Sequence, residues 1–300
     1  MSAPHPWSQV DLHLHTTASD GRLTPEQTVA LAVERGLRTI AITDHDSTSG
    51  VDAALAAASG TSLEVIPGVE LNTDVPSGEA HVLGYYLDHH HPEFERLLAE
   101  RRRARFSRGA KMVEKLRALN MDVTWERVQE IAGAAEGGEG GAVGRPHVAR
   151  ALLEKGYVTT LNEAFETYLG RNGPAYVPYA RFTPEEAVRA VRLAGGVSAL
   201  AHPTTFGDFQ VALPELIEAG LAGLECYYGL MLPHEVQPLL MVAAQHGLVA
   251  TGGSDFHGTD GPHMASLGMT PVPVSVVEAL KARHRRGIHP PATPIPPLRS

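Results

Sequence analysis

The stretch VDLHLHTTASDG, residues 10–21, combines the pattern of a buried strand with two closely spaced histidines. Successive side chains of an extended strand point to opposite faces. Asp11, His13 and His15 therefore share one face, and the leucines between them share the other. Two imidazoles side by side on one face indicate that they hold something between them. The alternative at this point is a polar face turned to water.

The composition is typical of a soluble globular protein, apart from a high content of 16 histidines. Of the 300 residues, 43% are hydrophobic and 20% are charged, which supports a sizeable core. The formal net charge of −9 argues against attraction to duplex DNA or to an anionic membrane surface. A single cysteine, Cys226, excludes an intrachain disulfide framework. With neither a signal peptide nor an apolar run of about 18 residues, we expect a cytoplasmic protein.

Short apolar runs alternate with helical patterns along most of the chain. The predicted strands are 9–15, 38–44, 63–71, 80–87, 197–202, 223–228 and 248–253. Segments 24–36 and 183–196 both begin Thr-Pro-Glu and end on glycine, which are start and stop signals of helices. This alternation predicts an α/β fold with a mainly parallel sheet. The lack of a glycine-rich phosphate fingerprint after the first strand favours a barrel over a dinucleotide-binding sheet.

The segment 93–178 interrupts the alternation of strands and helices. It holds helical patterns joined by glycine-rich turns, and we predict an all-helical insertion emerging from the loop face of the barrel. The barrel then comprises residues 1–92 and 179–290. The proline-rich tail 291–300 is expected to be poorly ordered.

Residue types that bind metal gather near the ends of the predicted strands. These residues are His13, His15, Asp20, His45, Glu70, His81, His202, Asp255 and His257. In parallel α/β folds, strand ends and the loops after them are where sites assemble. His81 falls at the start of its run instead, so its strand should be antiparallel or offset. Imidazoles and carboxylates without a thiolate suit Mn, Fe or Zn. Nine ligands exceed the needs of one ion, so we predict two or three divalent ions.

The motifs DLHLHTTASDG, ITDHD, GVE, AHP and GSDFHG occur in this order along the chain. In combination they resemble the motifs of the PHP family, the polymerase and histidinol phosphatase superfamily. The inserted GRPHVARALLEKGYV and AFETYLGRNGPAYVP further resemble the subgroup of 3',5'-nucleotide bisphosphate phosphatases and a short-RNA 5'-exonuclease. This resemblance implies a distorted (β/α)7 barrel with a helical insertion that serves as a substrate lid.

The resemblance also divides the nine residues among three metal sites. It implies that one ion is held by His13, His15, Glu70 and Asp255. Glu70 would bridge to a second ion, which is held by His81 and His202. A third ion would lie between Asp20, His45 and His257. On this interpretation His13 and His15 share a strand face because they chelate one ion together.

Other residues are candidates for contact with substrate or for support of the ligands. The candidates for substrate contact are Arg145, His147, Arg171 and His234. We expect Asp44 to orient an imidazole rather than to bind metal. We interpret the basic run 101–108 as a solvated helix face, with a grip on RNA phosphates as the alternative. The histidine tract 89–91 is interpreted as a solvated loop, although it could pass for a metal-binding tract.

The predicted activity is metal-dependent hydrolysis of a nucleotide phosphomonoester, with the 3'-phosphate of 3',5'-nucleotide bisphosphates as the first choice. A metal-bridging hydroxide would attack phosphorus, Glu70 would hold two ions, and no protein nucleophile is needed. A 5'→3' exoribonuclease on short RNA is the alternative, because the same chemistry cuts a phosphodiester. Histidinol-phosphate phosphatase is a weaker alternative. A non-catalytic metal-binding module is also a weaker alternative, since all nine ligand positions are filled.

Overall fold

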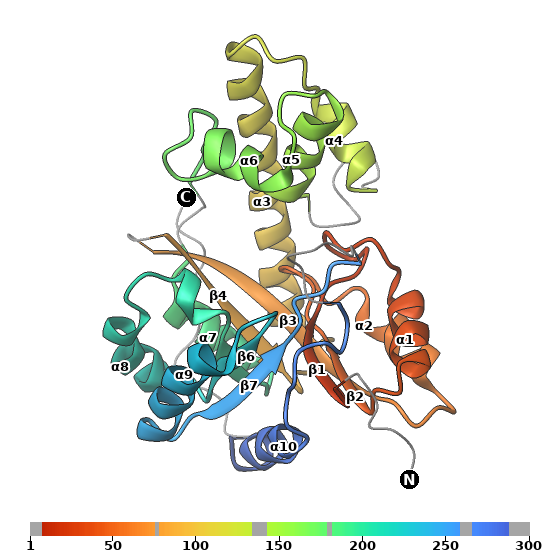
Figure 1. Ribbon diagram of the computed structural model, residues 1–300, viewed down its shortest axis with the longest axis vertical. Helices are drawn as coiled ribbons and strands as arrows, with labels where there is room; N and C mark the ends of the chain where they lie inside the picture. The colour runs from red at the N-terminus through yellow and green to blue at the C-terminus, as the bar shows by residue number, and fades with distance from the viewer. Residues whose placement is uncertain (1–7, 76–77, 134–142, 179–181, 259–265, 288–300) are drawn as a thin grey trace.

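The computed structural model describes residues 8–75, 78–133, 143–178, 182–258 and 266–287, and in them a seven-stranded sheet follows chain order. The strands are β1 (Val10–Leu14), β2 (Thr39–Ile42), β3 (Glu64–Val75), β4 (Gly78–Tyr85), β5 (Val197–Leu200), β6 (Gly223–Tyr228) and β7 (Val249–Gly253). A parallel bridge between Leu14 and Phe256 brings the first strand beside the last (Figure 1). The sheet is therefore a nearly closed barrel, as predicted.

Among the seven described strands, β4 runs antiparallel to both of its neighbours, β3 and β5. The other neighbouring strands pair in parallel. Because β4 is reversed, its beginning lies at the edge of the sheet where the parallel strands end. His81, near the beginning of β4, thereby reaches the same edge as the other candidate ligands. Of the two alternatives that we left open for His81, an antiparallel or an offset strand, the structure shows the antiparallel one.

Helices cover the outside of the barrel, and two of them begin at the Thr-Pro-Glu signals found in the sequence. They are α1 (Pro25–Glu34), α2 (Val51–Ala58), α7 (Pro184–Leu193), α8 (Phe209–Ala219), α9 (Pro233–Gln245), α10 (Ser275–Gly287) and the short 3₁₀ helix η2 (Pro203–Thr205). Thr24 and Thr183 cap α1 and α7, and a capping box is present at both. Within the described part of the chain, no helix has the combined length and apolarity needed to cross a bilayer.

Between β4 and α7 all regular elements of the described chain are helices, and Figure 1 shows them standing over one end of the barrel. They are α3 (Pro92–Ala118), α4 (Trp125–Ile131), α5 (Arg145–Glu154), α6 (Leu161–Ala164) and the π-helical turn η1 (Phe165–Leu169). This helical insertion has its own core, in which Met112 and Leu116 of α3 pack with Val148 and Leu152 of α5. The tail 291–300 lies outside the described residues.

The interpretation of the basic run 101–108 as a solvated face is wrong. Arg101, Arg105 and Arg108 of α3 are buried, with 0%, 3% and 5% of their surface exposed. Their spacing puts them on one face of α3. The carboxylate of Asp46, in the loop after β2, lies 3.6 Å from Arg101 Nε and 3.3 Å from Arg105 Nη1. Through Arg101 and Arg105 this arginine stripe joins α3 to the barrel, and the Asp46 carboxylate faces part of its positive charge.

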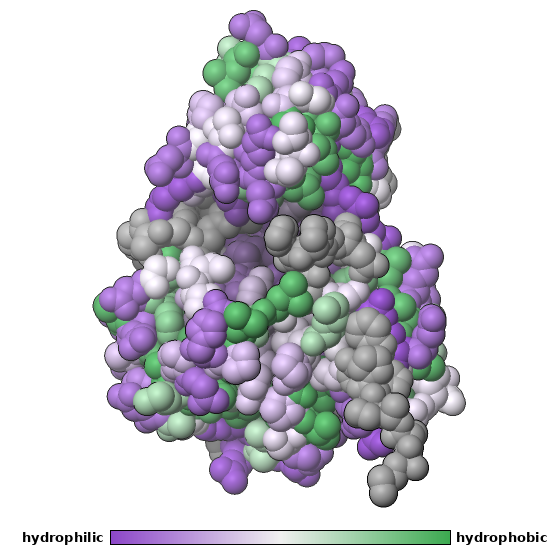
Figure 2. All heavy atoms as spheres, in the orientation of Figure 1, coloured by the Kyte–Doolittle hydropathy of each residue, from purple (hydrophilic) through white to green (hydrophobic). Residues whose placement is uncertain are grey.

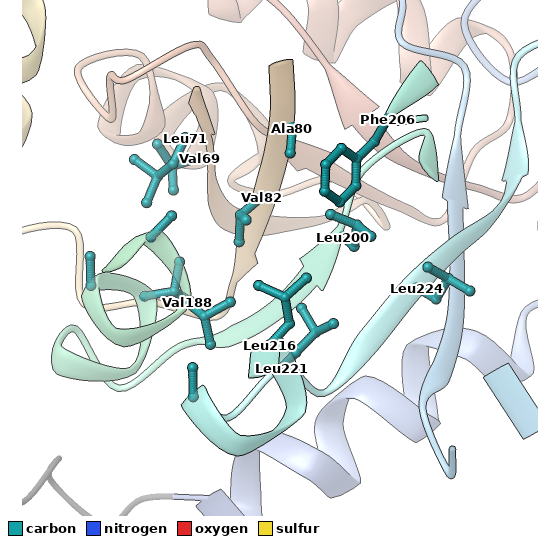
Figure 3. Packing of buried hydrophobic residues seen from close by; sticks show 14 of the residues in the cluster. Val69, Leu71, Ala80, Val82, Val188, Leu200, Phe206, Leu216, Leu221 and Leu224 are labelled. Carbon is teal, nitrogen blue, oxygen red and sulfur yellow. The ribbon is translucent and has the colours of Figure 1, made fainter. Parts of the chain in front are cut away.

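The largest apolar cluster lies between the sheet and the helices α7 and α8. Figure 3 shows Val69, Leu71, Val82 and Leu200 of the strands facing Val188 of α7 and leucines of the α8 region. The side chains of the sheet and of the helices are buried against each other, and this packing holds in place the strands that carry Glu70 and His81. A rigid scaffold of this kind holds polar side chains in place at the strand ends.

Candidate metal centre

The structure brings together all nine residues that we predicted as metal ligands. Each has a histidine nitrogen or a carboxylate oxygen within 4 Å of another member of the set. His13 and Glu70 lie within β1 and β3, His81 lies near the beginning of β4, and the other six lie in the segments that follow β1, β2, β5 and β7. Most are buried, so the cluster lies at the bottom of the barrel mouth rather than on a surface.

Four of these side chains converge on one point. The Nε2 atoms of His13 and His15 lie 3.4 and 3.3 Å from Glu70 Oε2. The same two nitrogens lie 3.4 and 3.1 Å from Asp255 Oδ1. Two ligands bound to one tetrahedral ion at bonds of about 2.0–2.1 Å are separated by about 3.3 Å. The spacing therefore suits donors around a common cation.

Glu70 lies between two groups of imidazoles. Its Oε2 faces His13 and His15, and His45 Nδ1 lies 2.9 Å from the same oxygen. Its Oε1 lies 2.8 Å from His81 Nδ1 and 3.0 Å from His202 Nε2. A carboxylate with one oxygen in each group has the placement that a bridging ligand requires.

A third group surrounds Asp20 in the loop after β1. His257 Nε2 lies 3.3 Å from Asp20 Oδ1, and His45 Nε2 lies 3.7 Å from Asp20 Oδ2. His15 Nδ1, at 3.8 Å from Asp20 Oδ1, connects this group to the first one. Asp20, His45 and His257 are the set that the resemblance implied for a third ion, and the division into ligand sets stays a prediction.

Several atoms of the centre are buried without a hydrogen-bond partner in the described structure. They are His13 Nε2, both ring nitrogens of His15, Asp20 Oδ2 and Glu70 Oε2. Buried polar atoms are nearly always paired, so unpaired atoms that point at one another need an explanation. Divalent cations would satisfy all of them. The residues present thus fit metal ions.

The charges of the centre favour cation binding. Burial alone would raise the pKa of Glu70, but the charges of His45 and His81 outweigh it and hold this pKa well below its usual range. Burial lowers the pKa of His45 to about 4, against the opposing effects of Glu70 and Asp20. At His15, burial is outweighed by Asp255 and Glu70, which raise its pKa to about 10, so metal binding there releases a proton.

Glu225 of β6 is part of the centre and was missed by the sequence analysis. Its Oε1 lies 3.0 Å from His13 Nδ1, and its Oε2 accepts a hydrogen bond of 2.7 Å from the backbone N–H of His202. The side chain is completely buried. The signal in GLECYY was a carboxylate inside a strand whose other buried positions are apolar. A partner of this kind fixes the orientation of a ligating imidazole.

Asp44 does not act as predicted. Its carboxylate accepts hydrogen bonds from the backbone N–H and the hydroxyl of Thr16, both at 2.7 Å, and from the hydroxyl of Ser19 at 2.5 Å. These bonds hold the loop that carries Asp20, so Asp44 positions a backbone segment rather than an imidazole. The described groups next to His45 Nδ1 are Glu70 Oε2, at 2.9 Å, and the side-chain amide of Asn72, at 3.2 Å.

The four candidates for substrate contact lie in different surroundings. His147 is 1% exposed, and its Nδ1 accepts a hydrogen bond from the backbone N–H of Gly144. Arg145 lies over the ring of Phe165, with its guanidinium carbon 5.6 Å from the ring centroid. Arg171 is exposed and donates to the backbone oxygen of Val75. His234 is exposed in the first turn of α9.

A cavity of about 420 Å³ lies between the loop after β1 and the insertion. Its lining comprises Thr17, Ser19, Gly21 and Arg22 of that loop, and Glu130, Ile131, Ala132, Gly133, His147 and Arg150 of the insertion. Arg150 donates a hydrogen bond of 2.8 Å to the backbone oxygen of Asp20, and its buried Nε has no hydrogen-bond partner in the described structure. Figure 2 shows a polar hollow between the insertion and the barrel. Arg22 and Arg150 had not been singled out from the sequence.

Comparison with known proteins gives matches over most of the chain. The sequence profile of the PHP domain matches residues 11–170. The 5'-3' exoribonuclease Rnm of Salmonella typhimurium is 39% identical, over 82% of this chain and 84% of its own. The 3',5'-nucleoside bisphosphate phosphatase of Chromobacterium violaceum is 30% identical, over 83% and 87% of the two chains. A Bifidobacterium adolescentis crystal structure, designated a metal-dependent phosphoesterase, has a TM-score of 0.81 at 33% identity, over 91% and 96% of the two chains.

Proposed function

Because the chain belongs to the PHP domain family, we propose that it is a 5'→3' exoribonuclease that shortens small RNA oligonucleotides. The coarser conclusion, that it is a metal-dependent phosphoesterase, follows from the family and from the relatives named as phosphoester hydrolases. The observation that carries a substrate with a 5'-phosphate is the cavity next to Asp20, because it offers two arginines to that group, and the choice of RNA rests on the identity to the exoribonuclease.

The RNA and the bisphosphonucleotide present the same reacting group. In each, a phosphorus atom is bonded to the 3'-oxygen of a nucleotide whose 5' end carries a phosphate. Water attacks this phosphorus, the bond to the 3'-oxygen breaks, and that oxygen leaves with the electron pair and takes up a proton. A 5'-mononucleotide is released in both cases. The substrates differ only in whether the phosphorus also carries the rest of an RNA chain.

We assign metal binding to the nine residues of the centre, with Glu70 between two sites. When bound, divalent ions supply positive charge to the phosphoryl oxygens and lower the pKa of water. The protein itself fixes the geometry of the ligands. Glu225 holds His13 and the backbone at His202, and the Tyr228 hydroxyl donates a hydrogen bond of 2.8 Å to Asp255 Oδ2. Such preorganised groups need no reorganisation during the reaction.

We assign the 5'-phosphate to the cavity next to Asp20. Arg22 and Arg150 supply positive charge there, and the neutral ring of His147 lines the same wall. Burial lowers the pKa of His147 to about 4, against the effect of Asp20, so this ring adds no charge near neutral pH. Arginine is suited to bidentate contact with phosphate oxygens. This placement puts one phosphate in the cavity and the next at the metal centre.

From the motifs alone we ranked the 3',5'-bisphosphonucleotide first, and the relatives include proteins named for each of the two activities; we place the exoribonuclease first on the higher identity. Identity is 39% to a protein named as an exoribonuclease and 30% to one named as a bisphosphate phosphatase, over similar shares of the chain. Bisphosphonucleotide hydrolysis stays as the second candidate, because the bond between phosphorus and the 3'-oxygen is broken in both substrates.

A direct comparison of substrates tests the proposal. Protein loaded with Mn²⁺ is incubated with a 5'-phosphorylated RNA pentamer, the same pentamer with a 5'-hydroxyl, a 3',5'-bisphosphonucleotide and histidinol phosphate. We expect the phosphorylated pentamer to lose mononucleotides from its 5' end, and the hydroxyl form to react more slowly. Turnover of the bisphosphonucleotide without any shortening of RNA would establish the second candidate instead. Release of phosphate from histidinol phosphate alone would contradict both.

A further inference from the structure

We propose that Asp52, His89 and His90 form a separate metal site on the outside of the barrel, suited to Zn²⁺ or a similar divalent transition metal. None of the three belongs to the nine residues of the metal centre. The proposal concerns the histidine tract 89–91, which the sequence alone led us to interpret as a solvated loop. It stands independently of the proposed exoribonuclease activity.

The three side chains converge on a common point. His89 Nε2 lies 2.9 Å from Asp52 Oδ1, and His90 Nε2 lies 3.2 Å from Asp52 Oδ2. One ligand atom from each of the three residues can be chosen so that these atoms all lie within 4.8 Å of one another. Donors on one tetrahedral ion are about 3.3 Å apart, so small adjustments would bring all three onto a zinc ion. Two imidazoles and a carboxylate are ligands that Zn²⁺ accepts.

The backbone explains how neighbouring histidines reach the same point. His89 and His90 occupy the centre of a turn, in which the backbone N–H of His91 donates to the carbonyl oxygen of Asp88 at 3.1 Å. The Asp88 carboxylate accepts a further bond of 3.1 Å from the N–H of His90. The two rings lie with their centroids 4.2 Å apart. The turn therefore holds both rings side by side before any ion binds.

A second carboxylate, that of Glu95, lies near the nitrogen of the His90 ring that does not face Asp52. Glu95 Oε1 lies 3.8 Å from His90 Nδ1, while His90 Nε2 faces Asp52. A carboxylate near the far nitrogen of a ligating histidine is the usual outer partner at zinc sites, since it orients the ring and raises its basicity. A short rotation of Glu95 would close this contact to hydrogen-bond distance.

The site has room for the remaining ligands of an ion. A groove of about 510 Å³ adjoins it, between the beginning of α2 and the first turns of α3, and its lining includes Thr48, Ser49, His89 and Arg102. Asp52 and His90 are 65% and 62% exposed, and His89 is 14% exposed. Water can therefore complete the coordination. An ion here would tie α2 to the turn that precedes α3, the helix that enters the insertion.

Zinc binding to matched variants tests the site. Wild-type protein and the double variant His89→Ala/His90→Ala are equilibrated with Zn²⁺ and freed of unbound metal, and metal per chain is measured by mass spectrometry. Because both proteins keep the catalytic centre, the difference isolates the outer site. We expect wild type to bind about one more equivalent, and Zn²⁺ to raise its Tm more than that of the variant. Equal stoichiometry with equal Tm shifts would overturn the proposal.

Single variants guard against a folding defect. Asp52→Asn keeps the shape of the carboxylate and removes its charge, and we expect it to lower zinc affinity at the outer site by at least about tenfold. His246→Ala, an exposed histidine beyond the end of α9, is the control and should leave the stoichiometry unchanged. Phosphoesterase activity should be the same in all of these variants. A loss of zinc in His246→Ala equal to that in Asp52→Asn would show non-specific binding and contradict the site.

Discussion

The Nδ1 atom of His13 lies 3.0 Å from the Oε1 atom of Glu225, and neither side chain is exposed to solvent. The second oxygen of Glu225 accepts a hydrogen bond from the backbone N–H of His202. One buried carboxylate thus fixes a histidine of β1 and the chain beyond β5. The pair connects ligands that we assign to two different ions.

Glu225→Gln tests this connection. The amide keeps the size of the side chain but removes the charge behind His13, which makes the imidazole a weaker ligand. Metal affinity should fall about 10–100-fold, as for other outer partners of ligating histidines. Titration with Mn²⁺ under competition from a chelator measures the change. Glu64→Gln, a carboxylate that pairs with Lys281 away from the centre, is the control. Equal affinities for wild type and Glu225→Gln would show that the contact plays no part in metal binding.

Glu70→Gln should have a larger effect, because this carboxylate faces both groups of imidazoles. The change removes one negative charge and one shared oxygen ligand, so bound metal should fall and activity should drop by orders of magnitude. Metal analysis and kcat on the same sample give both quantities. The far-UV circular dichroism should be unchanged, since the barrel core is apolar. Full metal retention with near-normal activity would remove the bridging assignment.

Arg150→Met tests the phosphate cavity. We expect kcat/KM for the 5'-phosphorylated pentamer to fall by roughly 1.5–3 kcal/mol in transition-state free energy, the value of a hydrogen bond to a charged group. Metal content should hold. The 5'-hydroxyl pentamer should lose much less, because it lacks the group that Arg150 would bind. Arg127→Met, an exposed arginine that pairs with Glu154, is the matched control. An equal loss on both pentamers would make Arg150 a structural residue of the Asp20 loop.

Asp46→Asn should destabilise the fold. Burial tends to raise the pKa of Asp46, but Arg101 and Arg105 outweigh it and lower that pKa. Loss of the charge breaks the ion pairs of Asp46 with two buried guanidinium groups, and breaking a buried pair costs about 3–5 kcal/mol in comparable cases. Urea unfolding measures the difference. Glu100→Gln breaks the exposed pair with Arg96 and should cost no more than about 1 kcal/mol. Similar costs for both would mean that the arginine stripe is stabilised in another way.

His147 gives the protein a stability that depends on pH. Its pKa is lowered to about 4 by burial, whereas in the unfolded chain it is near the ordinary value of about 6.5. Below about pH 6.5 the unfolded chain takes up a proton that the folded chain resists, so the free energy of unfolding falls as pH falls toward about 4. His147→Gln lacks this group, and its stability curve should be flatter in that window. Parallel curves for the two proteins would contradict the pKa shift.

The residues of the metal centre could be predicted from the sequence because their signals are local. His13 and His15 share a strand face, and the other candidates follow strands or lie in loops directly after them. The antiparallel direction of the strand carrying His81 was also foreseeable, since that residue stands at the wrong end of its run for a parallel strand. The barrel and the gathering of candidate ligands therefore follow largely from the alternation of strands and helices, whereas the division into ligand sets came from the family motifs.

Residues that act across long distances in the sequence could not be found in this way. Glu225 meets His13 only because β6 and β1 belong to one barrel, and Arg150 meets the loop of Asp20 only because the insertion lies over the mouth. The arginines of α3 were misinterpreted for the same reason. An amphipathic charged helix predicts a solvated face unless the position of Asp46 in space is known.

Helix α3 passes from the flank of the barrel into the insertion over 27 residues, a length of about 40 Å, without a break. Arg101 and Arg105 fasten its middle to the barrel loop at Asp46, and its later turns supply the core of the insertion. Hinged closure would require this rod to break its own backbone hydrogen bonds. A single unbroken helix therefore carries both the contact with the barrel loop and part of the core of the insertion, and it resists bending between them.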